Sequence, residues 1–276
     1  MLIASVVSRY SKKKRQTTSG IYIDNNKKGQ MTKIKQIAII GLLLTFTACN
    51  NNSKQSFNDH LTKANKYLVT CDFENGLKEF ELAKQIEPQN AEIYYSIGQT
   101  YFLLSDFKNA IDNYDKAIKL NPKYTFAYYS RGLTKSFNGD NLGGQEDITK
   151  AIELKPDFIF ALFQRATFKN SQGNTQGAID DLSLILKYKH DFVNCYYYRG
   201  LFYGLNKEYE KAVADLSKAI ELKIDRTNTY VYRGAYEYSL GQKDKACEDF
   251  YKARELGDSS SLEYIKKYCL EQENNK

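Results

Sequence analysis

Apolar residues recur at helical spacing along most of the chain. The segments AIDNYDKAI, QEDITKAI and AVADLSKAI each place apolar residues three and four positions apart, as on one face of an amphipathic helix. The chain contains only three prolines and its apolar residues are scattered, which favours helix over an all-β fold. The pattern therefore predicts an all-α domain.

The pattern repeats every 34 residues, from residue 57 to residue 260, without an insertion or deletion. The six units span 57–90, 91–124, 125–158, 159–192, 193–226 and 227–260. Small residues share the eighth slot of every unit: Ala64, Gly98, Gly132, Ala166, Gly200 and Gly234. Small residues also dominate the twentieth and twenty-seventh slots. They predict that two helices approach closely within each unit.

Turn residues also keep this register. The slot between the two helices of a unit holds a glycine in three units: Gly139, Gly173 and Gly241. Glycine there suits a left-handed C-cap. All three prolines share a slot near the end of a unit: Pro88, Pro122 and Pro156. Proline stops the second helix, so the later units must end that helix in another way.

This pattern resembles the tetratricopeptide repeat (TPR) family, and the resemblance covers residues 57–260. It implies a right-handed superhelix, an α-solenoid of six helix-turn-helix repeats that bind protein or peptide partners. No single repeat can bury its apolar face alone, so the stack is the domain. Residues 261–276 carry Leu262, Ile265 and Tyr268 at helical spacing and are predicted to form a capping helix and tail.

Slot seven and slot twenty-three carry matched charges. Four units hold an arginine and, sixteen residues later, an aspartate: Arg131–Asp147, Arg165–Asp181, Arg199–Asp215 and Arg233–Asp249. The first unit has Lys63 and Glu79 in these slots, whereas the second has the uncharged Ile97 and Asn113. A partly buried charge needs a partner, so we expect a salt bridge between the two helices of each unit. The alternative is that the arginines bind an anion, but the aspartates would cancel the field of such a site.

In the TPR family, slots two, five, six, nine, twelve and thirteen face a concave groove. Here these slots gather aromatic residues: Tyr95, Phe126, Tyr129, Phe160, Phe163, Tyr197, Tyr198 and Tyr232. Tyrosine offers contact area and a hydroxyl at low entropic cost. We expect a partner-binding groove for an extended peptide or a helix. The alternatives are that the rings pack against neighbouring helices, or that they stack on a glycan.

Some TPR proteins grip the C-terminal carboxylates of chaperones with basic and asparagine side chains. The matching places in this chain hold Leu61, Asn65, Ser96, Phe126 and Ser130. Only Asn65 fits that clamp, so we expect no chaperone-tail carboxylate clamp here.

The N-terminal segment 31–48 has the features of an export signal. Lys33 and Lys35 precede an apolar run of about ten residues, too short for a membrane span of roughly 20. Small residues lie just before Cys49. The segment resembles a bacterial lipoprotein signal peptide, which implies its removal and acylation of Cys49. The alternative is an uncleaved signal anchor with an incidental thiol.

The residues on either side of this signal are predicted to lie outside the folded domain. Residues 1–30 do not fit a signal peptide, and Met31 opens a complete one. Translation from Met31, with 1–30 as a non-native extension, competes with a disordered cytoplasmic tail. Residues 49–56 are predicted to form a polar tether. Because Asn50 and no acidic run follows Cys49, we expect an outer-membrane anchor facing the periplasm.

The formal charge of +7 invites a nucleic-acid hypothesis, but the charge is unevenly distributed. Nine Lys/Arg and one acid precede Cys49, which leaves the remainder at −1. The basic character therefore belongs to the leader, and we expect no nucleic-acid partner.

Catalytic motifs are missing from the sequence. Its two histidines, His60 and His190, lie far apart, and no Cys-x-x-Cys, Walker loop or nucleophile elbow occurs. We therefore expect no enzyme, no metal site and no cofactor. Cys247 and Cys269 fall on helices predicted to pack together, so a disulfide between them is a hypothesis, with buried free thiols as the alternative.

These features predict a non-enzymatic scaffold or adaptor, lipid-anchored in a bacterial cell envelope. The alternatives are a soluble cytoplasmic TPR adaptor and an envelope module that recognises a glycan or another non-protein ligand. The sequence does not name the partner or the pathway.

Overall fold

The computed structural model describes residues 54–270. The extension 1–30, the signal segment 31–48 and Cys49 lie outside the described residues. Residues 54–69 are helical, so the tether predicted over 49–56 does not extend to residue 56. The chain divides into two units, 1–56 and 57–276, and the second contains the repeats.

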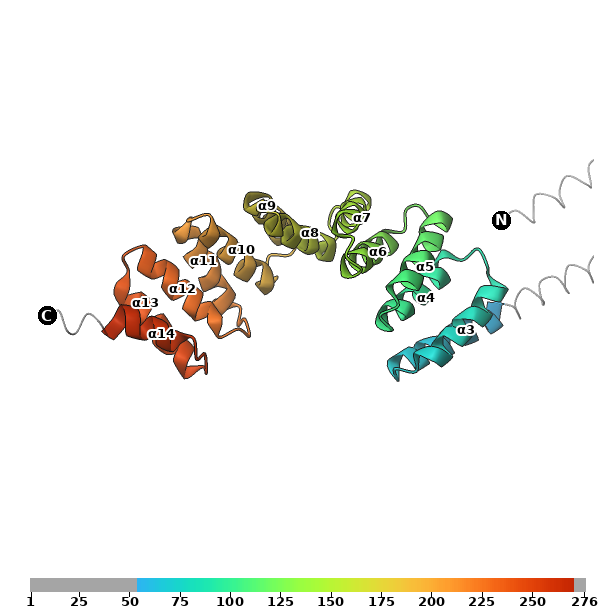
Figure 1. The fold of residues 1–276 in the computed structure, drawn as a ribbon, viewed down its shortest axis with the longest axis horizontal. Coiled ribbons are helices and arrows are strands. Elements are labelled where there is room, and N and C mark those ends of the chain that lie inside the picture. The colour runs from blue at the N-terminus through green and yellow to red at the C-terminus, as the bar shows by residue number, and fades with distance from the viewer. Residues whose placement is uncertain (1–53, 271–276) are drawn as a thin grey trace, which may run out of the picture. The chain divides into compact units, whose positions relative to one another are not determined.

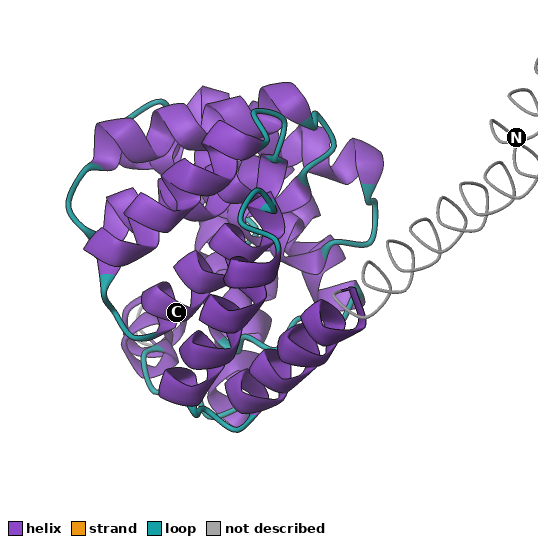
Figure 2. Ribbon diagram, turned by 90° about the vertical axis from the view of Figure 1, so that its right-hand side faces the viewer, coloured by secondary structure: helices purple, strands orange, loops and turns teal. Residues whose placement is uncertain are grey.

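The described residues form helices joined by short turns, with no strand among them, which confirms the all-α prediction (Figures 1 and 2). After the helix at 54–69, the first helices of the units are α4 (Ala91–Leu103), α6 (Thr125–Phe137), α8 (Ile159–Ser171), α10 (Val193–Leu205) and α12 (Asn228–Ser239). The second helices are α3 (Phe73–Ile86), α5 (Phe107–Leu120), α7 (Asn141–Leu154), α9 (Thr175–Tyr188), α11 (Tyr209–Glu221) and α13 (Lys243–Glu255). Each helix packs on the next in chain order.

The core has one large side chain per unit at slot twenty-four. These six side chains are almost fully buried: Phe80, Tyr114, Ile148, Leu182, Leu216 and Phe250. Burial of each contributes roughly 1.5–3 kcal/mol. The small residue in slot eight makes room for them, because a Cβ on Gly98 would lie 2.7 Å from the Tyr114 ring and one on Gly234 2.8 Å from the Phe250 ring. The predicted close approach of the two helices is therefore confirmed.

Every unit passes between its two helices through one residue with left-handed backbone. These residues are Cys71, Ser105, Gly139, Gly173, Lys207 and Gly241, with φ between 58° and 92°. The prediction of a left-handed cap is confirmed for the glycines, and three units adopt the same turn without one. The second helix then starts at an Asp or Asn N-cap in the first four units, whose side chain accepts a backbone N–H: Asp72, Asp106, Asp140 and Asn174.

The second helices end in two ways. Before each proline the C-cap residue is extended, as at Asn121 with φ −134°, and the chain then enters the next unit. The last three units lack the proline. The fourth ends like the proline-containing units, at Lys189 with φ −140°, whereas the last two use left-handed residues, Lys223 with φ 60° and Gly257 with φ 92°.

A short C-terminal segment covers the last unit. It consists of α14 (Ser261–Ile265) and a π-helical turn, η1 (Lys266–Leu270). Ile265 is buried against Phe250 and Val231, so the segment closes the apolar face that the last repeat would otherwise expose. Within the described range, no helix is long and apolar enough to cross a membrane.

Candidate partner-binding surface

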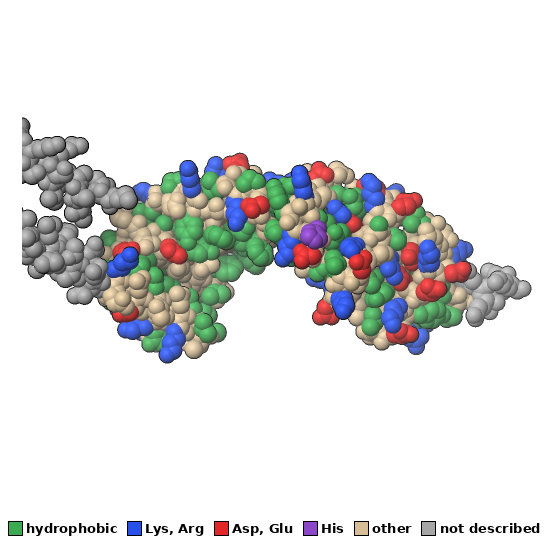
Figure 3. All heavy atoms as spheres, turned by 180° about the vertical axis from the view of Figure 1, so that it is seen from behind, with side chains coloured by type: hydrophobic (Ala, Val, Ile, Leu, Met, Phe, Trp, Pro, Cys, Tyr) green, Lys and Arg blue, Asp and Glu red, His purple; other side chains and the backbone are tan. Residues whose placement is uncertain are grey.

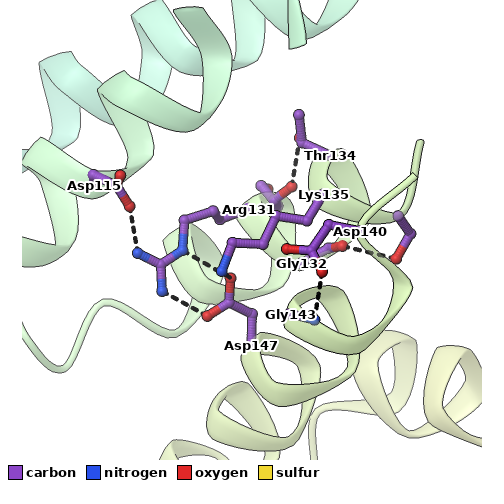
Figure 4. Close-up of polar contacts among 10 residues, drawn as sticks. Asp115, Arg131, Gly132, Thr134, Lys135, Asp140, Gly143 and Asp147 are labelled. Carbon is purple, nitrogen blue, oxygen red and sulfur yellow. Dashed lines mark hydrogen bonds and ion pairs between the residues drawn. The ribbon is translucent and has the colours of Figure 1, made fainter. Parts of the chain in front are cut away.

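The structure brings each predicted arginine–aspartate pair together between the two helices of one unit. In the third unit, Arg131 Nε and Nη2 donate to Asp147 Oδ2 and Oδ1 at 2.7 and 2.5 Å (Figure 4). The same two-pronged contact recurs in the other three pairs: Arg165–Asp181, Arg199–Asp215 and Arg233–Asp249. All four aspartates are buried, so each guanidinium balances a carboxylate that water barely reaches.

Each of three arginines also reaches back to the preceding unit, which the sequence analysis did not anticipate. Arg131 Nη1 contacts Asp115, while Arg199 and Arg233 donate from Nη1 to Ser183 Oγ at 3.0 Å and Ser217 Oγ at 3.1 Å. These acceptors all occupy slot twenty-five, so comparison of that slot among the units could have predicted the contact between units. Burial tends to lower the pKa of Arg131, but the hydrogen bonds that it donates to Asp147 and Asp115 outweigh this effect and raise the pKa. These three arginines join neighbouring repeats, and their guanidinium groups are bound within the scaffold.

The residue in slot eleven lies beside the aspartate of the arginine–aspartate pair, and its charge differs among the units. Lys135 and Lys169 occupy it in the third and fourth units and lie 2.9 Å from Asp147 and Asp181. The sixth unit has Glu237 there, beside Asp249. Burial and the charge of Asp249 raise the pKa of Glu237 to about 7. Glu237 Oε2 is buried without a hydrogen-bond partner among the described residues.

The first unit departs from the matched pattern. Glu79 pairs with His60, whose Nδ1 lies 2.6 Å from Glu79 Oε2, while Lys63 is exposed to solvent. Lys63 and Glu79 occupy slots seven and twenty-three, yet they do not form a salt bridge with each other in this unit. A histidine three residues before Lys63 takes its place.

The eight predicted groove residues differ in exposure. Phe126, Phe160 and Tyr232 are exposed, with fractions of 47%, 63% and 37%. Four are partly buried: Tyr95, Tyr129, Phe163 and Tyr198. Several rings contact one another across unit boundaries, as Phe163 does with Tyr198 at a centroid distance of 5.3 Å. Seven of the eight therefore keep some accessible surface.

Tyr197 is a correction to the predicted groove. Its side chain is only 3% exposed, because it packs with the buried Leu216 and Ala219 of α11. Its hydroxyl donates to Asn228 Oδ1 at 3.3 Å. In this unit the slot-five ring belongs to the scaffold, as the packing alternative stated.

Two hollows open on the first helices. One, of about 360 Å³, is lined mainly by α4 and α6: Leu68, Gln99, Phe102, Leu103, Tyr114, Tyr129, Ser130 and Leu133. The other, of about 370 Å³, is lined by α8, α10 and α12: Thr167, Asn170, Ser171, Tyr198, Leu201, Phe202, Leu205, Tyr232 and Tyr236. We call them the N-pocket and the C-pocket. Both are lined by residues in slots six, nine, twelve and thirteen of the first helices, and their walls are largely apolar. We call the surface formed by these slots the first-helix face.

Charged groups of both signs lie on the face that Figure 3 shows. Figure 3 shows basic and acidic side chains interspersed on the visible face, with hydrophobic side chains gathered between them. Such a distribution is unlike the single-sign basic patch of a nucleic-acid-binding protein.

The cysteines follow two patterns. Cys247 and Cys269 form a disulfide that ties α13 to the C-terminal cap, with Cα atoms 5.8 Å apart, as hypothesised from the sequence. Cys195 is a buried free thiol whose pKa burial raises to about 12, so it packs as a small apolar side chain. Cys71 is free and exposed.

Comparisons with known proteins identify the repeat. Residues 91–124 and 193–223 each match a tetratricopeptide repeat family model. The search of curated protein sequences gave no match.

Solved structures share the fold at low sequence identity. PilF from Pseudomonas aeruginosa superposes with a TM-score of 0.65 at 13% identity, covering 78% of this chain and 97% of that protein. MamA from Desulfovibrio magneticus RS-1 gives 0.56 at 20% identity, with 61% and 96% covered. YrrB, described as a TPR protein with an unusual peptide-binding site, gives 0.53 at 21% identity, with 67% and 95% covered. The chain thus contains tetratricopeptide repeats, folded as consecutive packed helix pairs.

Proposed function

We propose that the protein is a non-enzymatic scaffold, anchored through an acylated Cys49 in a bacterial cell envelope, that binds a partner peptide along its first helices. TPR proteins bind protein or peptide partners, and their repeats are generally scaffolds without catalysis. The observation that carries the proposal is the repeated apolar hollow on the first-helix face.

The two pockets suit a peptide because their walls combine apolar rings with a few polar groups. In the N-pocket, Ser130 Oγ lies 3.4 Å from Tyr95 Oη, and Gln99 Nε2 donates to the same hydroxyl at 2.7 Å. Apolar side chains of a partner can enter the hollows while its backbone meets these polar groups. The face shown in Figure 3 has no basic patch of the kind that would favour a nucleic acid over a peptide as the partner.

The disulfide supports an extracytoplasmic location. Structural disulfides persist in the periplasm and other oxidising compartments and are rare in the cytosol. The Cys247–Cys269 bridge therefore agrees with the export signal at 31–48 and favours the envelope over a cytoplasmic adaptor.

The groove is tested with Tyr232→Ala, which removes a ring that lines the C-pocket, is 37% exposed and should leave the fold intact. The matched control is Tyr188→Ala, an exposed ring on the second helix α9. Crosslinking in cells followed by mass spectrometry should recover the same partners with wild type and the control, and fewer with Tyr232→Ala. Equal recovery by all three proteins would exclude the first-helix face as the binding surface.

The anchor is tested separately with Cys49→Ala. Labelling with a palmitate analogue should mark the wild-type protein and not the variant, which should leave the membrane fraction. Equal labelling of both proteins would rule out acylation at Cys49.

A further inference from the structure

The aromatic register of the first-helix face changes in the fifth unit. In units two to four the last residue of the unit places a ring against the ring in slot five: Tyr124 on Tyr95, Phe158 on Tyr129, and Phe192 on Phe163. In unit five the last residue is Arg226. Its guanidinium carbon lies 5.0 Å from the ring centroid of Tyr197 and 5.6 Å from that of Tyr198. A cation thus replaces an aromatic ring at one point of the face.

Arg226 differs from the four arginines of the repeat pairs. Each of those is bound to a buried aspartate, whereas Arg226 is exposed and forms no ion pair within residues 54–270. Asp225 is its immediate neighbour, yet no carboxylate among residues 54–270 lies within salt-bridge distance of its guanidinium. Its five N–H donors are therefore not held by a carboxylate of the described residues.

The surroundings restrict where this cation points. The two tyrosine rings under the guanidinium favour a stacked orientation and lower the entropy lost when it binds an anion. Tyr198 also lines the C-pocket together with the exposed Tyr232. Tyr232 in turn contacts Tyr197 at a centroid distance of 6.3 Å. A positive group and an apolar hollow are therefore joined through shared tyrosines.

We propose that Arg226 binds a carboxylate of the partner peptide while a neighbouring apolar side chain of that peptide enters the C-pocket. This inference rests on the proposed function, because it specifies the peptide that the first-helix face selects. A guanidinium matches a carboxylate in a bidentate, charge-assisted geometry. The carboxylate comes from an Asp or Glu side chain or from the C-terminus of the peptide.

The test is selection from a random nine-residue peptide library with free C-termini, carried out on the full chain. Arg226→Gln keeps a polar side chain of similar length but removes the charge. The matched control is Arg254→Gln, which removes an exposed arginine from the second helix α13. All three proteins should melt at the same temperature, since neither arginine is buried.

Wild type and the control should enrich peptides with a carboxylate next to an aromatic or aliphatic residue. Arg226→Gln should keep the apolar preference, lose the acidic one, and bind the selected wild-type peptide about tenfold more weakly. That difference should shrink as salt rises, because screening weakens the pairing of exposed charges. Recognition of the C-terminus would appear in wild type as an apolar preference at a fixed distance from the C-terminus, and Arg226→Gln should lose that fixed distance. Apolar enrichment in wild type with neither an acidic preference nor a fixed distance from the C-terminus, or identical profiles for wild type and Arg226→Gln, would overturn the Arg226 proposal and leave the peptide-binding function intact. Selection of no peptide by wild type would overturn both.

Two synthetic forms of the selected peptide separate the sources of the carboxylate. Amidation of the C-terminus should weaken binding if Arg226 contacts the terminal carboxylate, and replacement of the acidic side chain by its amide should weaken binding if it contacts that side chain. If neither change weakens binding, no carboxylate contacts Arg226 and the proposal fails.

Discussion

Arg199 Nε lies 2.6 Å from Asp215 Oδ2, joining the two helices of the fifth unit across sixteen residues of sequence. The guanidinium also lies over the rings of Tyr196 and Tyr203. Asp215 is buried, and within residues 54–270 its side chain is paired with Arg199 alone. The pair therefore satisfies a charge that would otherwise be buried without a partner.

Arg199→Met is expected to destabilise the domain by about 3 kcal/mol, because it leaves the buried Asp215 carboxylate unpaired. Adding Asp215→Leu removes that carboxylate and should restore most of the loss. Urea unfolding of the single and double variants measures both effects. Lys218→Met, which breaks the exposed Lys218–Glu221 pair, serves as the control and should change little. Equal midpoints for the two Arg199 variants would contradict this role.

Glu237 is expected to make folding pH-dependent. Its pKa is about 7 in the folded chain and 4.5 in the reference state, because burial and Asp249 disfavour the carboxylate. Between these values the unfolded chain ionises while the folded chain stays protonated, so stability falls as pH rises from about 4.5 to 7. Glu237→Gln should remove this fall and gain about 2 kcal/mol at pH 8. Urea midpoints measured across this pH range, with the exposed Glu248→Gln as control, provide the test. Matching profiles for the two variants would exclude Glu237 as the source.

Lys207 is expected to strain the turn of the fifth unit. Its φ of 63° is left-handed, a conformation that costs a non-glycine residue about 1 kcal/mol. Lys207→Gly should therefore raise the thermal midpoint, whereas Gly173→Ala, at a φ of 80°, should lower it. Both changes lie in the same slot and can be compared by thermal unfolding. A lower midpoint for Lys207→Gly would show that the added flexibility of the unfolded chain outweighs relief of the strain.

Reduction of the Cys247–Cys269 disulfide is expected to destabilise the C-terminal cap. The bridge closes a loop with a sequence separation of 22, for which chain entropy predicts about 3 kcal/mol. Unfolding of wild type should therefore shift on addition of reductant, and a Cys247→Ser/Cys269→Ser variant should not respond. Cys71→Ser, which removes an exposed free thiol, should respond like wild type. No shift in wild type would mean that the bridge does not contribute to stability.

The sequence predicted the helix pairs well because the 34-residue register lets the units be compared with one another. That comparison identified the Arg131–Asp147 pair and the turn glycines such as Gly139. The comparison did not identify the partner of Glu79, because the slot of His60 holds a histidine in the first unit only. It also missed the left-handed Cys71, Ser105 and Lys207, since only glycine signals that backbone by residue type.

The groove was less predictable than the repeat. Slot five was expected to face a partner in every unit, yet Tyr197 is buried whereas the slot-two ring of Phe160 is exposed. The exposure of a ring depends on which side chains of the next helix and turn pack against it. The slot of the ring does not specify those side chains. Arg226 shows the same limit, because its importance follows from the rings beneath it.

The sequence by itself determined the period, the helix pairs, the turns and the charged pairs, because these depend on contacts at constant separation within a repeating unit. Only the tertiary structure decided which tyrosines remain accessible and where the first-helix face is hollowed. Those properties depend on how side chains from different units fill the space between packed helices, and the residues that fill it vary from unit to unit.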